Sequence, residues 1–156
     1  MTNDLLYSTS VNMWIDRSIF GINEAPSADE PGDIWALMEV DDTPVRVGLG
    51  AILFRSTVGR HKSLVTVEVR TASTCPDQGF ESIYHDVYRS RSGKAVLSNI
   101  DGPKINFALQ SETEYTLSVW RKGGDTAPAR HDEMLGVVLP IEGLEEYVIQ
   151  FVPAAQ

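Results

Sequence analysis

The sequence predicts an all-β protein, an antiparallel β-sandwich of about nine strands in which residues 1–156 form a single domain. Apolar residues recur at every second position in 65–69, 105–109 and 147–151, which places each apolar set on one face of a strand. Clusters of Gly, Pro, Asp, Asn and Ser separate these segments, and almost no segment has a clear helical pattern. An up-and-down barrel is the alternative architecture.

The first half of the chain contains four segments that predict strands: 5–20 (as one strand or two), 33–40, 45–54 and 64–69. Residues 23–33 are rich in proline and acids and have the composition of an exposed loop. The segment 33–40 favours a strand, but its apolar spacing also fits one face of a helix. Within 45–54, Gly48 and Gly50 indicate a bulge or a close approach of another backbone.

The second half predicts the remaining strands, at 81–89, 95–99, 104–109, 115–120, 134–140 and 144–152. Residues 81–89 fit either an edge strand or a helical turn. Residues 104–122 form the predicted centre of the fold, a β-hairpin whose polar turn 110–114 brings two alternating strands together. The last two strands predict a second hairpin, with its turn at Glu142-Gly143.

The charge is acidic and unevenly distributed. The net charge of −9 divides into −7 over residues 1–54, +3 over 55–130 and −5 over 131–156. Nucleic-acid binding requires clustered positive charge, so a nucleic-acid partner is not expected. A basic protein partner would be attracted and steered by this field, although acidic surfaces also serve simply to keep proteins in solution.

The chain carries no sign of a membrane or secretory protein. Its longest apolar runs are too short to span a bilayer, and its first residues lack the pattern of a secretory signal. Cys75 is the single cysteine, so no internal disulfide forms. We therefore expect a cytoplasmic protein with no membrane partner.

No catalytic residue, metal site or cofactor is predicted. The three histidines have no metal-ligand spacing: His61, His85 and His131. The pairs His85-Asp86 and His131-Asp132 resemble the His-Asp pair of metal phosphohydrolases, but a dipeptide is weak evidence and that family is helical. The sequence also lacks a phosphate loop and a Gly-x-Ser-x-Gly motif, and no neighbour of Cys75 activates its thiol.

Six residues are candidates for binding a partner: Asp29, Glu30, Asp33, Asp41, Asp42 and Trp120. The five acids lie in loop-rich sequence without a lysine or arginine, where they present negative charge to a basic protein. Trp120 follows Val119 and points away from the apolar face, as an exposed aromatic side chain at an interface does. Alternatively, the acidic loops meet at one edge of the sandwich and bind Ca²⁺.

The segments VTV (65–67), AVLSNI (95–100), INFAL (105–109) and YTLSVW (115–120) follow one another in an order that resembles the competence protein J family. Members of that family are small bacterial β-sandwich proteins that inhibit a DNA-entry nuclease. The resemblance covers about residues 63–121. It implies an acidic protein without catalytic residues that occupies the basic substrate cleft of a nuclease.

These observations together predict a non-enzymatic protein-binding module. The favoured role is an acidic inhibitor or immunity protein that blocks a basic bacterial nuclease or toxin. The alternative is an accessory β-sandwich that binds a ligand or calcium, and a small enzyme is the third interpretation.

Overall fold

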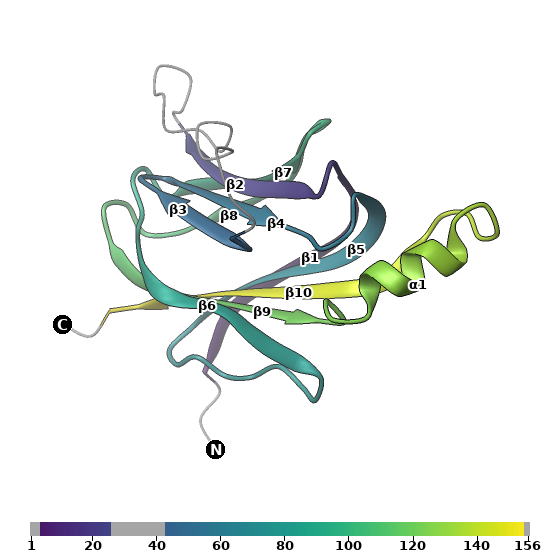
Figure 1. The fold of residues 1–156 in the computed structure, drawn as a ribbon. Helices are drawn as coiled ribbons and strands as arrows, with labels where there is room; N and C mark the ends of the chain where they lie inside the picture. Colours follow the sequence, from purple (N-terminus) through teal and green to yellow (C-terminus); the bar gives the residue numbers. More distant parts are fainter. Residues whose placement is uncertain (1–3, 26–42, 155–156) are drawn as a thin grey trace.

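The computed structural model describes residues 4–25 and 43–154 and shows ten strands and one short helix in them (Figure 1). The elements are β1 (Leu5–Asp16), β2 (Ile19–Ala25), β3 (Val45–Gly48), β4 (Ala51–Arg55), β5 (Arg60–Arg70), β6 (Phe80–Arg89), β7 (Lys94–Asn99), β8 (Gly102–Ala108), β9 (Glu114–Lys122), α1 (Ala127–Met134) and β10 (Glu142–Pro153). The prediction of an all-β protein is confirmed.

All ten strands belong to one sheet, which closes almost completely into a barrel (Figure 1). The strand order is β3-β4-β2-β1-β5-β10-β9-β6, and β7 pairs with both β2 and β8. Asp16 and Ile19, on either side of the first turn, are the only residues that pair β1 with β2. The sheet therefore bends at this turn, and its two parts face each other across the core.

The prediction of an antiparallel sandwich is wrong, because the sheet is mixed and barrel-shaped. Strand β10 lies between β5 and β9, and it runs parallel to β5 and antiparallel to β9. Tyr147, for example, has Val65 on one side and Arg121 on the other. Side chains alternate between faces in the same way in parallel and antiparallel strands, so the sequence pattern contains no information about strand direction.

The predicted hairpin at 104–122 is also wrong. Strand β8 pairs with β7, whereas β9 pairs with β6 and β10, so the connection between β8 and β9 crosses from one part of the sheet to the other. Their apolar faces still share one core: the rings of Phe107 and Tyr115 each lie with their centroids 5.9 Å from that of Phe151. Burial requires that two apolar faces meet, and two strands can meet across a core without sharing hydrogen bonds.

Two further segments differ from the prediction. Residues 45–54 are a hairpin rather than one bulged strand, and Gly50 has a φ of 68° in its turn, which glycine adopts easily. The predicted strand 134–140 is instead the last residue of α1 and an irregular segment, so the second hairpin does not exist. Of the two possibilities for 81–89, the structure shows the edge strand, β6. The predicted strand 33–40 lies outside the described residues.

A buried carboxylate holds β2 to the turn between β6 and β7. Glu24 is buried and accepts hydrogen bonds from the backbone nitrogens of Arg91 (2.8 Å) and Gly93 (2.7 Å) and from the Tyr88 hydroxyl. Burial and the hydrogen bond to Glu24 raise the pKa of Tyr88 far above its usual value, so its hydroxyl remains a donor. A Cβ at Gly93 would lie 2.2 Å from the carbonyl oxygen of Leu109, which leaves glycine as the fitting residue.

Candidate functional site

The three most exposed large apolar side chains of the described residues, Leu135, Val137 and Leu139, lie together with Val138 in one segment that follows α1. Their exposed fractions are 62% for Leu135, 78% for Val137, 43% for Val138 and 92% for Leu139. We call α1 together with residues 135–140 the arm, and Figure 1 shows it projecting from one end of the barrel. Contiguous apolar side chains that remain in water usually mark an interaction site, since burying them would be favourable.

The base of the arm is fixed to the barrel. A small buried cluster anchors it, formed by Val58, Ala127, Ile141 and Leu144 with Met134 packed against them. The chain enters the arm at Gly123, where φ is 87° and a Cβ would lie 2.2 Å from the carbonyl oxygen of Leu144. These contacts hold the arm to the barrel at one defined place, which we call the root of the arm.

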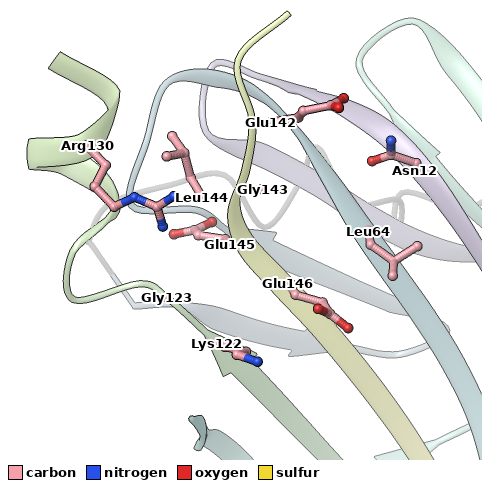
Figure 2. Close-up of a pocket in the computed structure, with 10 residues that line it drawn as sticks. All are labelled: Asn12, Leu64, Lys122, Gly123, Arg130, Glu142, Gly143, Leu144, Glu145 and Glu146. Atoms are coloured by element: carbon pink, nitrogen blue, oxygen red, sulfur yellow. The ribbon is translucent and has the colours of Figure 1, made fainter. Parts of the chain in front are cut away.

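A cavity of about 510 Å³ lies beside this root (Figure 2). Its wall is formed by Arg130 of the arm and by residues that flank the arm or lie on neighbouring strands: Asn12, Leu64, Lys122, Gly123, Glu142, Gly143, Leu144, Glu145 and Glu146. Charged groups of both signs face the same space, with Arg130 on α1 and Glu146 on β10 in Figure 2. Because opposite charges offset one another, the cavity has no clear preference for a cation or an anion.

Glu145 ends in a buried polar cluster behind the cavity wall, and its side chain is fully enclosed. Its Oε1 accepts hydrogen bonds from the Ser56 hydroxyl (2.6 Å) and the Tyr147 hydroxyl (2.7 Å). Its Oε2 accepts from the backbone nitrogen (3.1 Å) and the hydroxyl of Thr57. His61 completes the cluster, with Nε2 2.9 Å from the Ser56 oxygen and 3.7 Å from Glu145 Oε1. Ser56 donates its only hydroxyl hydrogen to Glu145. In the contact between Ser56 and His61, Nε2 of His61 is therefore the donor and the Ser56 oxygen is the acceptor.

Ser56, His61 and Glu145 are the residue types of a hydrolytic triad, but their geometry differs from one. In a triad, serine donates to one nitrogen of histidine and the acid holds the other nitrogen. Here Ser56 donates to Glu145, both lie on the Nε2 side of His61, and Nδ1 faces the Ser63 hydroxyl at 3.3 Å. The cluster instead joins the turn after β4 to the start of β10, which supports the root of the arm.

The cluster favours a neutral histidine beside an ionised carboxylate. Burial lowers the pKa of His61, and the nearby Glu145 opposes this only in part. Burial by itself would raise the pKa of Glu145, but the hydrogen bonds from Ser56, Thr57 and Tyr147 outweigh it and leave the pKa below its usual value.

These shifts predict that the protein loses stability as the pH falls. In the unfolded chain His61 takes up a proton as the pH falls below its ordinary pKa of 6.5. In the folded chain the pKa of His61 is lower, so His61 takes up its proton only at a lower pH. The free energy of unfolding should therefore fall below that pH, by up to about 1.4 kcal/mol per pH unit for each extra proton bound by the unfolded state. Glu145 contributes to the free energy of unfolding above pH 4.5, the ordinary pKa of its carboxyl. This contribution is lost as the pH falls through the lower pKa that Glu145 has in the folded chain.

Urea unfolding at a series of pH values from neutral to mildly acidic tests this expectation. The His61→Gln variant should show a shallower decline below pH 6.5 than the wild type. His85→Gln is the control, because His85 is exposed and should leave the His61 contribution intact. Identical slopes for the wild type and His61→Gln would show that the buried histidine does not set the dependence.

The partner-binding residues predicted from the sequence do not belong to the arm. Trp120 lies on the outer side of β9, half-buried, and its Nε1 donates to Gln150 Oε1 at 3.1 Å. It does not line the cavity at the root. The acidic candidates Asp29, Glu30, Asp33, Asp41 and Asp42 all lie outside the described residues, so the predictions made for them stay predictions.

The other residues that were considered for chemistry are scattered. His85 on β6 is exposed and its Nδ1 lies 2.7 Å from the Ser118 hydroxyl, His131 lies on α1, and Cys75 is exposed in the loop before β6. Across residues 4–25 and 43–154, no group of three or more His, Cys, Asp or Glu side chains is placed to hold a metal ion. Within the same ranges, no helix has the length and apolar character needed to cross a membrane.

Sequence reasoning missed both the arm and the buried carboxylate of Glu145. A signal for α1 was present, because Pro128 occupies the first turn, where proline is favoured. The apolar run after α1 also fits the pattern of a strand, which is the sequence prediction for 134–140. Glu145 had no local signal: it is adjacent to Glu146 and differs from it only in which side of β10 it occupies.

No family model and no curated protein matches the chain. Solved structures do share its fold. One is the crystal structure of ComJ from Bacillus subtilis, described as the inhibitor of the DNA degrading activity of NucA; it is 15% identical, with a TM-score of 0.60, and the match covers 96% of this chain and 97% of ComJ. Another, described as crocagin biosynthetic gene J, is 11% identical with a TM-score of 0.51 over 96% of this chain and 98% of its own. The predicted resemblance to competence protein J is confirmed as a similarity of fold, over far more than residues 63–121.

Proposed function

We propose that this chain is a protein inhibitor that binds a nuclease and closes its substrate cleft. The fold is shared with ComJ along nearly the whole length of both chains, and ComJ inhibits a nuclease. One fold can serve several functions. The shared fold therefore supports an inhibitory role, but it does not define which surface of this chain would bind the nuclease. The arm is the observation that carries the proposal, because it gives this chain a projecting apolar surface of its own.

The composition around the arm suits a partner with a basic cleft. Apolar side chains form its tip, and acids occupy both ends of the segment: Asp132 and Glu133 on α1, Glu142 and Glu146 at the start of β10. Residues 131–156 contain no lysine or arginine. An apolar centre with a charged rim is the usual arrangement of a specific protein interface, and negative charge would steer a basic nuclease toward it.

The acids predicted from the sequence fit the same partner as a second contact. Asp29, Glu30, Asp33, Asp41 and Asp42 would add to the negative field that attracts a basic protein, and Trp120 would add an aromatic contact. If electrostatic attraction guides the encounter, association should slow as ionic strength rises, because salt screens exposed charges.

Capture followed by an activity assay tests the proposal. The chain is immobilised, exposed at low salt to a lysate of its source organism and eluted at high salt. The eluate should degrade plasmid DNA, and adding free chain should suppress that degradation. A column carrying an unrelated protein of similar net charge is the control. An eluate no more active than the control eluate, or activity that free chain does not suppress, would refute the inhibitory role.

A further inference from the structure

A second cavity, of about 420 Å³, collects three arginines that are far apart in the sequence. Its lining residues are Arg17, Ser18, Pro44, Arg55, Ser56, Thr57 and Arg121. Arg17 lies in the turn between β1 and β2, Arg55 is the last residue of β4, and Arg121 lies near the end of β9. No acidic side chain is among these lining residues, although the protein as a whole is strongly acidic.

Backbone hydrogen bonds hold the walls of this cavity together. The nitrogen of Arg55 donates to the carbonyl oxygen of Pro44 (2.8 Å), and that of Ser56 donates to Ser18 (2.7 Å). Arg17 and Ser18 form a two-residue turn with φ values of 54° and 66°, which residues other than glycine rarely adopt. The tight turn places Arg17 at the cavity, so the arginines are brought together by the fold before any ligand binds.

The nearest acids are directed elsewhere. Asp16 lies 3.5 Å from Arg60 and accepts a hydrogen bond from the backbone nitrogen, not the side chain, of Arg17. Glu81 lies at 3.9 Å from Arg121 Nη2, at the limit of an ion pair. Glu145, behind the cavity, is already engaged by the hydroxyls described above. The lining of the cavity therefore carries three guanidinium groups and no carboxylate, which leaves an excess of positive charge.

The arginines also have unused donors. Among residues 4–25 and 43–154, no hydrogen bond or ion pair reaches the guanidinium of Arg17 or Arg55. The Nε atoms of Arg55 and Arg121 are enclosed by protein and have no acceptor within the same ranges. Enclosed donors of this kind are uncommon in native proteins, and a missing ion is one of their physical explanations.

We propose that this cavity binds a phosphate group, carried by free phosphate or by a small phosphomonoester. The planar guanidinium group donates paired hydrogen bonds that match the oxygens of a phosphate, and three arginines line one space together with Ser18. The site is separate from the arm, so its ligand is bound whether or not the chain inhibits a nuclease.

Isothermal titration calorimetry with inorganic phosphate at constant ionic strength tests the site. The wild type should bind phosphate saturably in the low millimolar range or tighter, and acetate should bind much more weakly. Arg55→Gln and Arg17→Gln should each weaken phosphate binding about tenfold or more, because each removes a charged donor. Adenosine monophosphate distinguishes the two sources: tighter binding than inorganic phosphate indicates a phosphomonoester, and weaker binding indicates the free ion.

Arg60→Gln is the matched control. It removes the same charge near the same turn, but Arg60 faces Asp16 and lies outside the cavity. It should therefore bind phosphate like the wild type. Absence of phosphate binding by the folded wild type would overturn the proposal, and so would equal weakening in the Arg60→Gln and Arg55→Gln variants. Circular dichroism of each variant confirms that it is folded, and neither negative result bears on the inhibitory role of the arm.

Discussion

Replacing Glu145 with alanine is expected to lower the free energy of unfolding by about 3 kcal/mol or more. The change removes the acceptor of the Ser56 and Tyr147 hydroxyls, both of which belong to buried residues. It also releases Thr57, whose backbone nitrogen and hydroxyl both donate to the same carboxylate. Urea unfolding at neutral pH measures the loss, and Glu145→Gln, which keeps one amide oxygen as an acceptor, should lose less.

Glu146→Ala is the control for this experiment. Glu146 is the next residue, lies on the other side of β10 and is half-buried in the wall of the cavity. Its removal should change the free energy of unfolding by about 0.5 kcal/mol or less, as is usual for a surface position. Similar losses for the two variants would show that the buried hydrogen bonds of Glu145 do not hold the root of the arm.

The second large effect concerns the tip of the arm and rests on the proposed inhibitory function. Changing both Val137 and Leu139 to aspartate should weaken binding to the captured nuclease by about a hundredfold or more, since central apolar contacts contribute most of the energy of an interface. Both side chains are exposed, so the free energy of unfolding should remain close to that of the wild type. Surface plasmon resonance gives the affinity, and inhibition of DNA degradation gives the functional loss.

Leu49→Asp supplies the comparison. Leu49 is a large exposed apolar residue in the turn between β3 and β4, away from the arm. It should retain binding, because the new charge does not enter the interface. Full inhibition by the double variant at the tip, or an equal loss in Leu49→Asp, would place the interface elsewhere, for example at the acidic loop residues or Trp120.

The sequence by itself determined the local features of this protein. Alternation at 65–69, 105–109 and 147–151 correctly located parts of β5, β8 and β10, and it showed which side chains face the core. These features follow from the period of two of an extended chain, which each segment expresses independently of its neighbours. The order of the segments 65–67, 95–100, 105–109 and 115–120 was also sufficient to predict the fold resemblance that the comparison with ComJ confirms.

Only the tertiary structure decided which strands are neighbours. Strand β10 lies beside β5 in parallel, and β8 and β9 face each other across the core, because burial of an apolar face can be satisfied by any partner that covers it. The same reason explains the candidate site. Glu145 and Glu146 are identical residues in the sequence, yet one is enclosed by hydroxyls from β10 and from the turn between β4 and β5, whereas the other faces the cavity. Likewise, Arg17, Arg55 and Arg121 share one cavity only because the sheet bends after β1 and closes almost into a barrel.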